Sequence, residues 1–379
     1  MNRNVVIAGY ARSPHHFAGK GDLARVRPDD LAAQVVKSVV ERTGVAPDDI
    51  EDLIMGCAFP EGEQGFNIAR LVVFLAGLPE SVAGTTVNRF CGSSMQAIHM
   101  AAGAIQMDAG DVFVCAGVES MTRVPMMGFN PAPHPGLAKE NAGAYMSMGE
   151  TAENLARKYQ ITREAQQDFA IRSHQRAAAA WEQGRFGDEV VPITVNGKTV
   201  ERDGTIRPDS SQESLSGLKP AFDKDGTVTA GTSSPLTDGA SATIVASEEY
   251  AKAHGLPILA RVRSSAVSGC DPTIMGIGPV PATKKALKRA GVELSDIDVI
   301  ELNEAFAAQS MAVGHELGLD WDRTNLDGGA IALGHPLGAS GARITGKAAQ
   351  VMQREGKGLA LATMCIGGGQ GIATVLEAV

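Results

Sequence analysis

The sequence predicts an α/β protein made of two similar halves, with a subdomain inserted into the first half. Strand-like and helix-like segments alternate over residues 5–118 and again over residues 259–379. The stretch from 121 to 145 is rich in Met, Pro, Gly and Asn and has no clear period. Such alternation is typical of helices layered on a mostly parallel sheet. We therefore expect residues 1–118 and 237–258 to form the first half, 119–236 the inserted loop domain and 259–379 the second half.

The elements of the first half follow from β-branched runs and from apolar residues at helical spacing. Strands are expected at residues 5–8, 53–57, 85–87 and 112–117, and a strand at 241–246 returns to the sheet after the insertion. Helices are expected at 29–41, 67–75 and after Cys91, and the insertion adds helices at 149–159 and 162–183. The first helix illustrates the pattern, because Leu31, Val35 and Val39 lie on one face.

The second half repeats this order in a faint form. Its expected strands are 259–267, 299–302, 324–326, 359–364 and 372–376, and its expected helices are 282–290, 304–317 and 338–354. Each half has a strand, a loop with a reactive side chain, a helix and a further strand, with Cys91 in the first loop and His335 in the second. Because ligands bind beyond the carboxyl ends of such strands, we expect both loops to meet at one centre.

Composition excludes several classes of protein. The chain has 379 residues, a net charge of −9 and no basic run, so a nucleic-acid surface is not expected. Its five cysteines are widely spaced without a CxxC pair, which argues against disulfides or a zinc site and favours a reducing, cytoplasmic location. No apolar run reaches membrane-spanning length, and the first strand begins too early for a leader peptide.

Cys91 is the first candidate for chemistry. It lies where the run Thr85–Val87 turns into a segment with apolar residues at helical spacing, and Gly92, Ser93 and Ser94 suit the first turn. The positive end of the helix dipole is expected to lower its pKa and favour the thiolate. Alone, the cysteine is better explained as a buried structural residue.

Three further stretches accompany Cys91. Residues 328–341 form a glycine-rich loop around His335, residues 364–371 place Cys365 before three glycines, and Asn303 stands between a strand and a helix. Each has a structural alternative: a phosphate-binding loop, a tight hairpin with an incidental cysteine, and a simple helix N-cap.

Together these stretches resemble the thiolase family. The resemblance rests on NRFCGSS around Cys91, NEAFAA from Asn303, GGAIALGHPLGASG around His335, CIGGGQG from Cys365, and TAGTSSPLTDGA at residues 229–240. It implies two α/β halves with central mixed sheets in αβαβα layers, plus a loop domain. It also implies cleavage of 3-ketoacyl-CoA by coenzyme A, giving acetyl-CoA and a shortened acyl-CoA.

The resemblance assigns a role to each site residue. Cys91 carries the acyl group, His335 takes its proton, and Cys365, with an ordinary thiol pKa, moves the proton of the acetyl-CoA enolate. One oxyanion site is formed by His335 with a water held by Asn303, and the other by the backbone N–H groups of Cys91 and Gly367. No metal or cofactor is needed, because coenzyme A is a substrate. A looser set of coenzyme A and substrate contacts comprises Arg207, Ser214, Phe222, Ser234, Met148, Met275 and Phe306.

Two details favour a degradative enzyme of fatty-acid β-oxidation with broad chain length. Biosynthetic members usually carry His at the place of Ser147, and the Arg89–Gln96 spelling is similar to that of degradative members. The alternatives are an acetoacetyl-CoA thiolase (acetyl-CoA acetyltransferase) working in the condensing direction and a non-catalytic acyl-CoA-binding protein. A ketoacyl synthase is disfavoured by Cys365, and a papain-like protease by the α/β repeat. The family implies a homodimer or homotetramer, with a β-oxidation multienzyme as a possible partner and no membrane.

Overall fold

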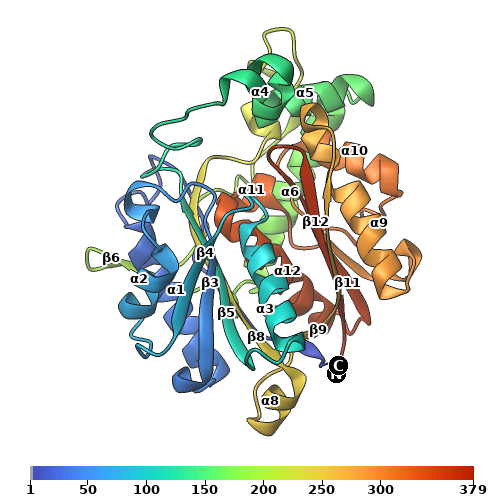
Figure 1. Cartoon of the computed structure of the whole chain (residues 1–379). Coiled ribbons are helices and arrows are strands. Elements are labelled where there is room, and N and C mark those ends of the chain that lie inside the picture. The colour runs from blue at the N-terminus through green and yellow to red at the C-terminus, as the bar shows by residue number, and fades with distance from the viewer. Residues whose placement is uncertain (1–2) are drawn as a thin grey trace.

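The computed structural model describes residues 3–379 (Figure 1), so residues 1 and 2 of the expected first half lie outside the described part. The strands are β1 (Val5–Arg12), β2 (His16–Phe17), β3 (Ile50–Gly56), β4 (Ala83–Val87), β5 (Val112–Ser120), β6 (Ile193–Val195), β7 (Lys198–Val200), β8 (Thr237–Ser247), β9 (Ala260–Gly269), β10 (Val299–Leu302), β11 (Leu359–Ile366) and β12 (Gln370–Glu377). The helices are α1 (Pro28–Thr43), α2 (Ile68–Leu75), α3 (Ser93–Gln106), α4 (Pro135–Glu140), α5 (Met148–Lys158), α6 (Arg163–Glu182), α7 (Gln212–Ser216), α8 (Glu248–Ala253), α9 (Pro279–Ala290), α10 (Ala307–Leu317), α11 (Ala330–Leu333) and α12 (Leu337–Arg354). No helix within residues 3–379 is both long and apolar enough to cross a membrane.

The two halves repeat one strand order. The main sheet runs β10-β11-β12-β9-β1-β8-β5-β3-β4, and the halves join where Val6 and Ile7 of β1 pair with Arg261 and Ala260 of β9. In the first half β8 lies antiparallel between β1 and β5, and in the second half β12 lies antiparallel between β9 and β11. The sheet is therefore mixed, and the expectation of a mostly parallel sheet in the first half was wrong. The apolar pattern of a strand does not reveal which strands it pairs with in the sheet.

Five layers build the molecule (Figure 1). Helix α1 covers the outer face of the first half-sheet, α9 covers that of the second, and α3 and α12 lie between them. Helix α12 is buried along most of its length and packs against strands of both halves. Small residues permit this position: a Cβ on Gly341 would lie 2.3 Å from the Met95 nitrogen of α3. The layered α/β fold of two similar halves is confirmed.

The segment 119–236 leaves and re-enters the sheet at neighbouring strands. β5 ends at Ser120 and β8 begins at Thr237, and Ser120 pairs with Asp238 across the two strands. The intervening chain carries α4 to α7 and the short β6–β7 hairpin. Helices α4 and α5 lie at one end of the molecule, beyond the sheet, in Figure 1. Helix α4 was missed because its six residues are too few to show a period.

Two other expected elements differ in the second half. The expected strand 324–326 is a single bridge between Thr324 and Ile300, because Asn325 adopts a left-handed φ of 51°. The Asn325 amide replaces the ladder by bonding both the N–H and the C=O of Leu302, at 2.9 and 2.8 Å. Helix α10 begins at Ala307 rather than residue 304, since the buried Glu304 carboxylate accepts hydrogen bonds from Ser173 and Asn325 instead.

Candidate active site

Cys91 lies buried in a tight turn that leads into α3. Gly92 is the N-cap of α3, and Ser93 and Ser94 form its first turn as expected. The preceding Phe90 has a left-handed φ of 42°, held because its N–H donates to Asn88 Oδ1 at 2.8 Å and its C=O accepts from Ser93 Oγ at 2.6 Å. A Cβ on Gly92 would lie 2.7 Å from Ile366 Cδ1, so a larger residue here would displace the Ile366 side chain. The turn is therefore pressed against the β11–β12 hairpin.

Burial dominates the ionisation of Cys91. Removal of the thiol from water raises its pKa to about 12, although the N–H groups of Gly367 and of Cys91 itself lower it. The nearby carboxylate of Glu119 raises it further. The expectation of a lowered pKa was wrong for the resting protein, since desolvation outweighs the helix end. Cys91 is thus a thiol that needs a base to become a nucleophile.

His335 is held as a neutral base. Its backbone N–H donates to Thr237 Oγ1 at 3.0 Å, and its Nδ1 lies 2.5 Å from Ser340 Oγ. The Ser340 hydroxyl already donates to Pro336 O at 3.0 Å, so we assign the ring proton to Nδ1 and leave Nε2 as the acceptor. Burial, aided by the charge of Arg343, lowers the pKa of His335 to about 3.

Asn303 lies beside the unprotonated nitrogen of His335. Its Nδ2 is 3.3 Å from Nε2, and its backbone N–H donates to Thr363 O at 3.0 Å. It is not a helix N-cap, because α10 begins four residues later with Phe306 as its cap. Within residues 3–379, no protein group bonds the buried Asn303 Oδ1. The amide oxygen is therefore able to bond a water, as the expected oxyanion site requires.

Cys365 is fully buried near the end of β11, and its charge state is coupled to that of Cys91. Burial raises the pKa of Cys365 well above its ordinary value, and ionisation of Cys91 raises it further. The expectation of an ordinary thiol pKa was therefore wrong. Gly367, Gly368 and Gly369 form the turn into β12, with φ of 77° at Gly368 and 81° at Gly369. The two thiols disfavour simultaneous ionisation, so one can hold a proton while the other reacts.

Five of the seven expected coenzyme A and substrate residues gather near Cys365. Met148, Met275 and Phe306 belong to the same apolar cluster as Cys365. The Phe222 ring meets Phe306 edge-on with centroids 5.7 Å apart, and the Ser234 N–H donates to Ala305 O at 2.9 Å.

The other two lie apart from this cluster. The exposed Arg207 places its guanidinium 5.0 Å from the Phe17 ring centroid. The exposed Ser214 lies in the first turn of α7, where its hydroxyl accepts from the N–H of the N-cap residue Ser211. The assignment of Arg207 and Ser214 to the coenzyme A channel stays a prediction.

Glu119 is a residue of the site that sequence reasoning missed. Its buried carboxylate accepts hydrogen bonds from the backbone N–H groups of Ala58 and Gly338, at 2.8 and 2.9 Å, and from Gln64 Nε2 at 2.7 Å. It thereby ties the start of α12, just after His335, to the first half. A charged residue that ends the long apolar run of β5 is the signal that could have found it.

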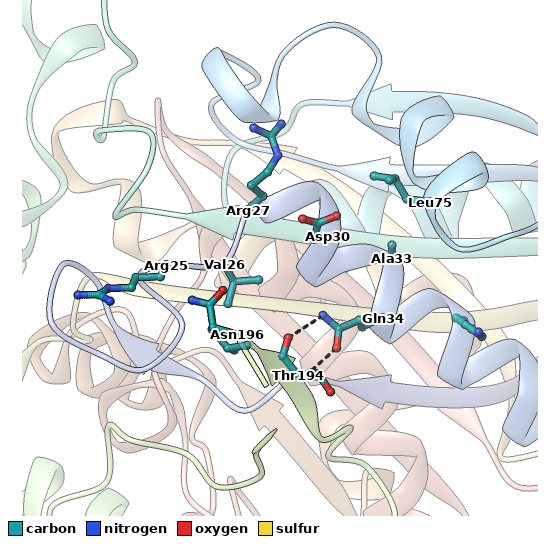
Figure 2. Close-up of a pocket in the computed structure, with 11 residues that line it drawn as sticks. Arg25, Val26, Arg27, Asp30, Ala33, Gln34, Leu75, Thr194 and Asn196 are labelled. Carbon is teal, nitrogen blue, oxygen red and sulfur yellow. Dashed lines mark hydrogen bonds between the residues drawn. The ribbon is translucent and has the colours of Figure 1, made fainter. Parts of the chain in front are cut away.

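A cavity of about 610 Å³ lies away from this chemistry (Figure 2). It opens between α1 and the β6–β7 hairpin, where Gln34 and Thr194 exchange two hydrogen bonds, and Arg25, Arg27 and Asp30 line it. None of the expected site residues lines it. Among residues 3–379, no cluster of His, Cys, Asp and Glu is arranged to hold a metal ion.

Known family models and relatives match nearly the whole chain. Residues 5–249 match the family model "Thiolase, N-terminal domain", and residues 256–378 match "Thiolase, C-terminal domain". A 3-ketoacyl-CoA thiolase of Marinobacter nauticus is 53% identical over 99% of this chain and 98% of its own length. The Bacillus subtilis 3-ketoacyl-CoA thiolase is 48% identical over 100% of both chains.

Two solved structures are similar over their full length. Human mitochondrial 3-ketoacyl-CoA thiolase in complex with CoA has a TM-score of 0.92 and 41% identity, with 100% of this chain and 98% of that chain covered. The Bacillus anthracis acetyl-CoA acetyltransferase has a TM-score of 0.92 and 42% identity, covering 100% and 99%.

Proposed function

This chain belongs to the thiolase family, and on that premise we propose that it is an acyltransferase that cleaves 3-ketoacyl-CoA with coenzyme A. The products are acetyl-CoA and a shortened acyl-CoA. The observation that carries the proposal is a pair of buried thiols in which ionisation of Cys91 raises the pKa of Cys365, while the Gly367 N–H group lowers the pKa of Cys91. A protein that only bound acyl-CoA would need neither the second buried thiol nor the neutral His335.

The first step forms an acyl-cysteine. His335 Nε2 takes the proton of Cys91, and the thiolate attacks the 3-keto carbon of the substrate. The N–H groups of Cys91 and Gly367 stabilise the oxyanion that forms. The Cα–Cβ bond then breaks and leaves the enolate of acetyl-CoA, whose oxygen accepts from the protonated Nε2 and from the water on Asn303.

The second step releases both products. Cys365 donates its proton to the enolate carbon, which completes acetyl-CoA. The resulting Cys365 thiolate takes the proton of the coenzyme A thiol, which attacks the acyl-Cys91 thioester. The Cys91 thiolate leaves and recovers its proton from His335. No net proton is gained or lost, and the chemistry needs neither a metal nor a further cofactor.

We further infer a degradative enzyme of fatty-acid β-oxidation. Ser147 stands where biosynthetic members usually carry His, and here its side chain caps α5 through a capping box with Glu150. The curated relatives with the name 3-ketoacyl-CoA thiolase support this inference. The similarity to the Bacillus anthracis acetyl-CoA acetyltransferase favours the second candidate, an acetoacetyl-CoA thiolase.

Thiolysis across a chain-length series separates the candidates. We expect kcat/KM to rise from acetoacetyl-CoA to medium- and long-chain 3-ketoacyl-CoA. Activity on acetoacetyl-CoA alone would favour the second candidate. Absence of thiolysis for every chain, in protein that binds coenzyme A, would support the non-catalytic binding protein instead.

We also propose that residues 119–236 form the loop domain and that the protein is a homodimer or homotetramer in the cytoplasm. Among residues 3–379, β4 pairs only with β3 and leaves its outer edge open. Beside this edge, Phe66 is 96% exposed and Phe74 of α2 is 50% exposed. An open edge flanked by exposed apolar side chains is suited to a second copy of the chain. Light scattering of the purified protein measures the oligomer, and co-purification tests for a β-oxidation multienzyme.

A further inference from the structure

Arg89 and Gln370 connect the Cys91 turn to the glycine turn after Cys365. Arg89 precedes Cys91 by two residues, and its Nη1 donates to Gln370 Oε1 at 2.9 Å while its Nε donates to Gln96 Oε1 at 2.9 Å. Gln370 in turn donates from Nε2 to Gly367 O at 3.4 Å. A continuous chain of side-chain hydrogen bonds therefore runs from Gln96 of α3 to Gly367, whose N–H group lowers the pKa of Cys91.

Neighbouring residues hold the Gly369 end of the glycine turn. The Cys270 N–H donates to Gly369 O at 2.8 Å, and a Cβ on Gly369 would lie 2.5 Å from Cys270 O. Three consecutive glycines have unusual backbone freedom, and Gly368 and Gly369 already use left-handed conformations. Among the described residues, a Cβ on Gly368 would meet nothing within 4 Å, and one on Gly367 would meet only ordinary contacts at 3.5 Å and beyond. Side-chain packing therefore fixes Gly369 more tightly than Gly367, and the Gln370 amide adds a hydrogen bond at Gly367 O.

We propose that Arg89 and Gln370 are positioning residues that aim the Gly367 N–H at Cys91. This inference rests on the proposed function and deepens it. The two backbone donors of the oxyanion site come from different halves of the chain, and donors of this kind act only when they are correctly placed. The Arg89–Gln370 contact crosses between the two halves of the chain, beside both donors.

The test compares two Gln370 variants with a matched control. Gln370→Met keeps the length of the side chain and loses both hydrogen bonds. Gln370→Glu keeps an acceptor for Arg89 but cannot donate to Gly367 O when ionised. The control is Thr374→Val, which removes another bond between α3 and β12, the 2.8 Å contact of Thr374 Oγ1 with His99 Nε2.

We expect both Gln370 variants to lower kcat of thiolysis about tenfold with little change in KM for coenzyme A. A displaced Gly367 N–H group also stabilises the Cys91 thiolate less, which raises the pKa of Cys91. Alkylation of Cys91 by iodoacetamide, located by mass spectrometry, then slows about tenfold for a pKa rise of about one unit. Thr374→Val is expected to leave kcat and the alkylation rate unchanged.

Two results would overturn the inference: wild-type alkylation and kcat in both Gln370 variants, or equal slowing in Thr374→Val. The alkylation rate does not depend on turnover. A wild-type protein that is alkylated at Cys91 but shows no thiolysis would refute the proposed function. The alkylation rates of the Gln370 variants would still decide whether the Arg89–Gln370 contact positions Gly367.

Discussion

Glu301 gives the protein a stability that depends on pH in an unusual direction. Its carboxyl group on β10 is 1% exposed, and within residues 3–379 neither oxygen has a hydrogen-bond partner. Burial raises its pKa from 4.5 to about 8, although Arg343 and Lys347 lower it. The charges of Asp327 and Glu189 raise it further. Glu301 is therefore protonated in the folded protein at neutral pH and ionised in the unfolded chain.

The sign and size of the effect follow from this difference. Between the unfolded pKa of 4.5 and the folded pKa of about 8, the folded state holds a proton that the unfolded state has lost. The contribution of Glu301 to the free energy of unfolding is thus present at low pH and is lost as pH rises through that window. At about 1.4 kcal/mol per pH unit, the whole window corresponds to roughly 5 kcal/mol, of which about 2 kcal/mol lies between about pH 6 and about pH 8.

Glu301→Gln tests this reasoning, because the amide has the shape of the protonated carboxyl group and cannot ionise. Urea unfolding at about pH 6 and about pH 8, at one fixed protein concentration, measures the free energy of unfolding. We expect the wild type to lose about 2 kcal/mol more than the variant over this interval. Parallel pH profiles for the two proteins would show that Glu301 is not protonated in the folded state.

Two further predictions concern the site. Cys365→Ser is expected to keep acyl transfer from a simple acyl-CoA to Cys91. It is expected to slow cleavage of 3-ketoacyl-CoA by about a hundredfold or more, because the enolate loses the acid that protonates it. Steady-state thiolysis measures this rate, and unchanged cleavage would show that Cys365 does not transfer the proton. Ser340→Ala leaves Nδ1–H of His335 without its acceptor and is expected to lower kcat about fivefold, the effect of roughly 1 kcal/mol. An unchanged kcat in a folded variant would show that another group holds the ring.

Much of the fold could be predicted from the sequence, because apolar spacing is a local property. The strand 299–302 has the expected ends, and α12 begins one residue before the expected position. Strand order could not be predicted in this way. The antiparallel return of β8 between β1 and β5 depends on contacts more than a hundred residues apart. The left-handed Asn325 likewise ends a strand that its neighbours favour.

In the site, too, local features could be predicted from the sequence and long-range contacts could not. Motifs sufficed to select Cys91, His335, Cys365 and Asn303, whose catalytic roles remain proposals. The raised pKa of Cys91 could not be foreseen, since it follows from burial and not from its place before a helix. Ser340 was within reach of sequence reasoning, because it lies in the first turn of the helix that follows His335. The contacts of Glu119 and Gln370 join segments far apart in sequence and needed the structure.

The most direct test of the proposed function is to locate the acyl group on the protein. The protein is incubated with an acyl-CoA, digested at low pH and analysed by mass spectrometry. We predict one acyl thioester, on Cys91, which is absent in Cys91→Ser and retained in Cys365→Ser. An acyl group on another cysteine, or none in protein that turns over 3-ketoacyl-CoA, would contradict the assignment of Cys91 as the nucleophile.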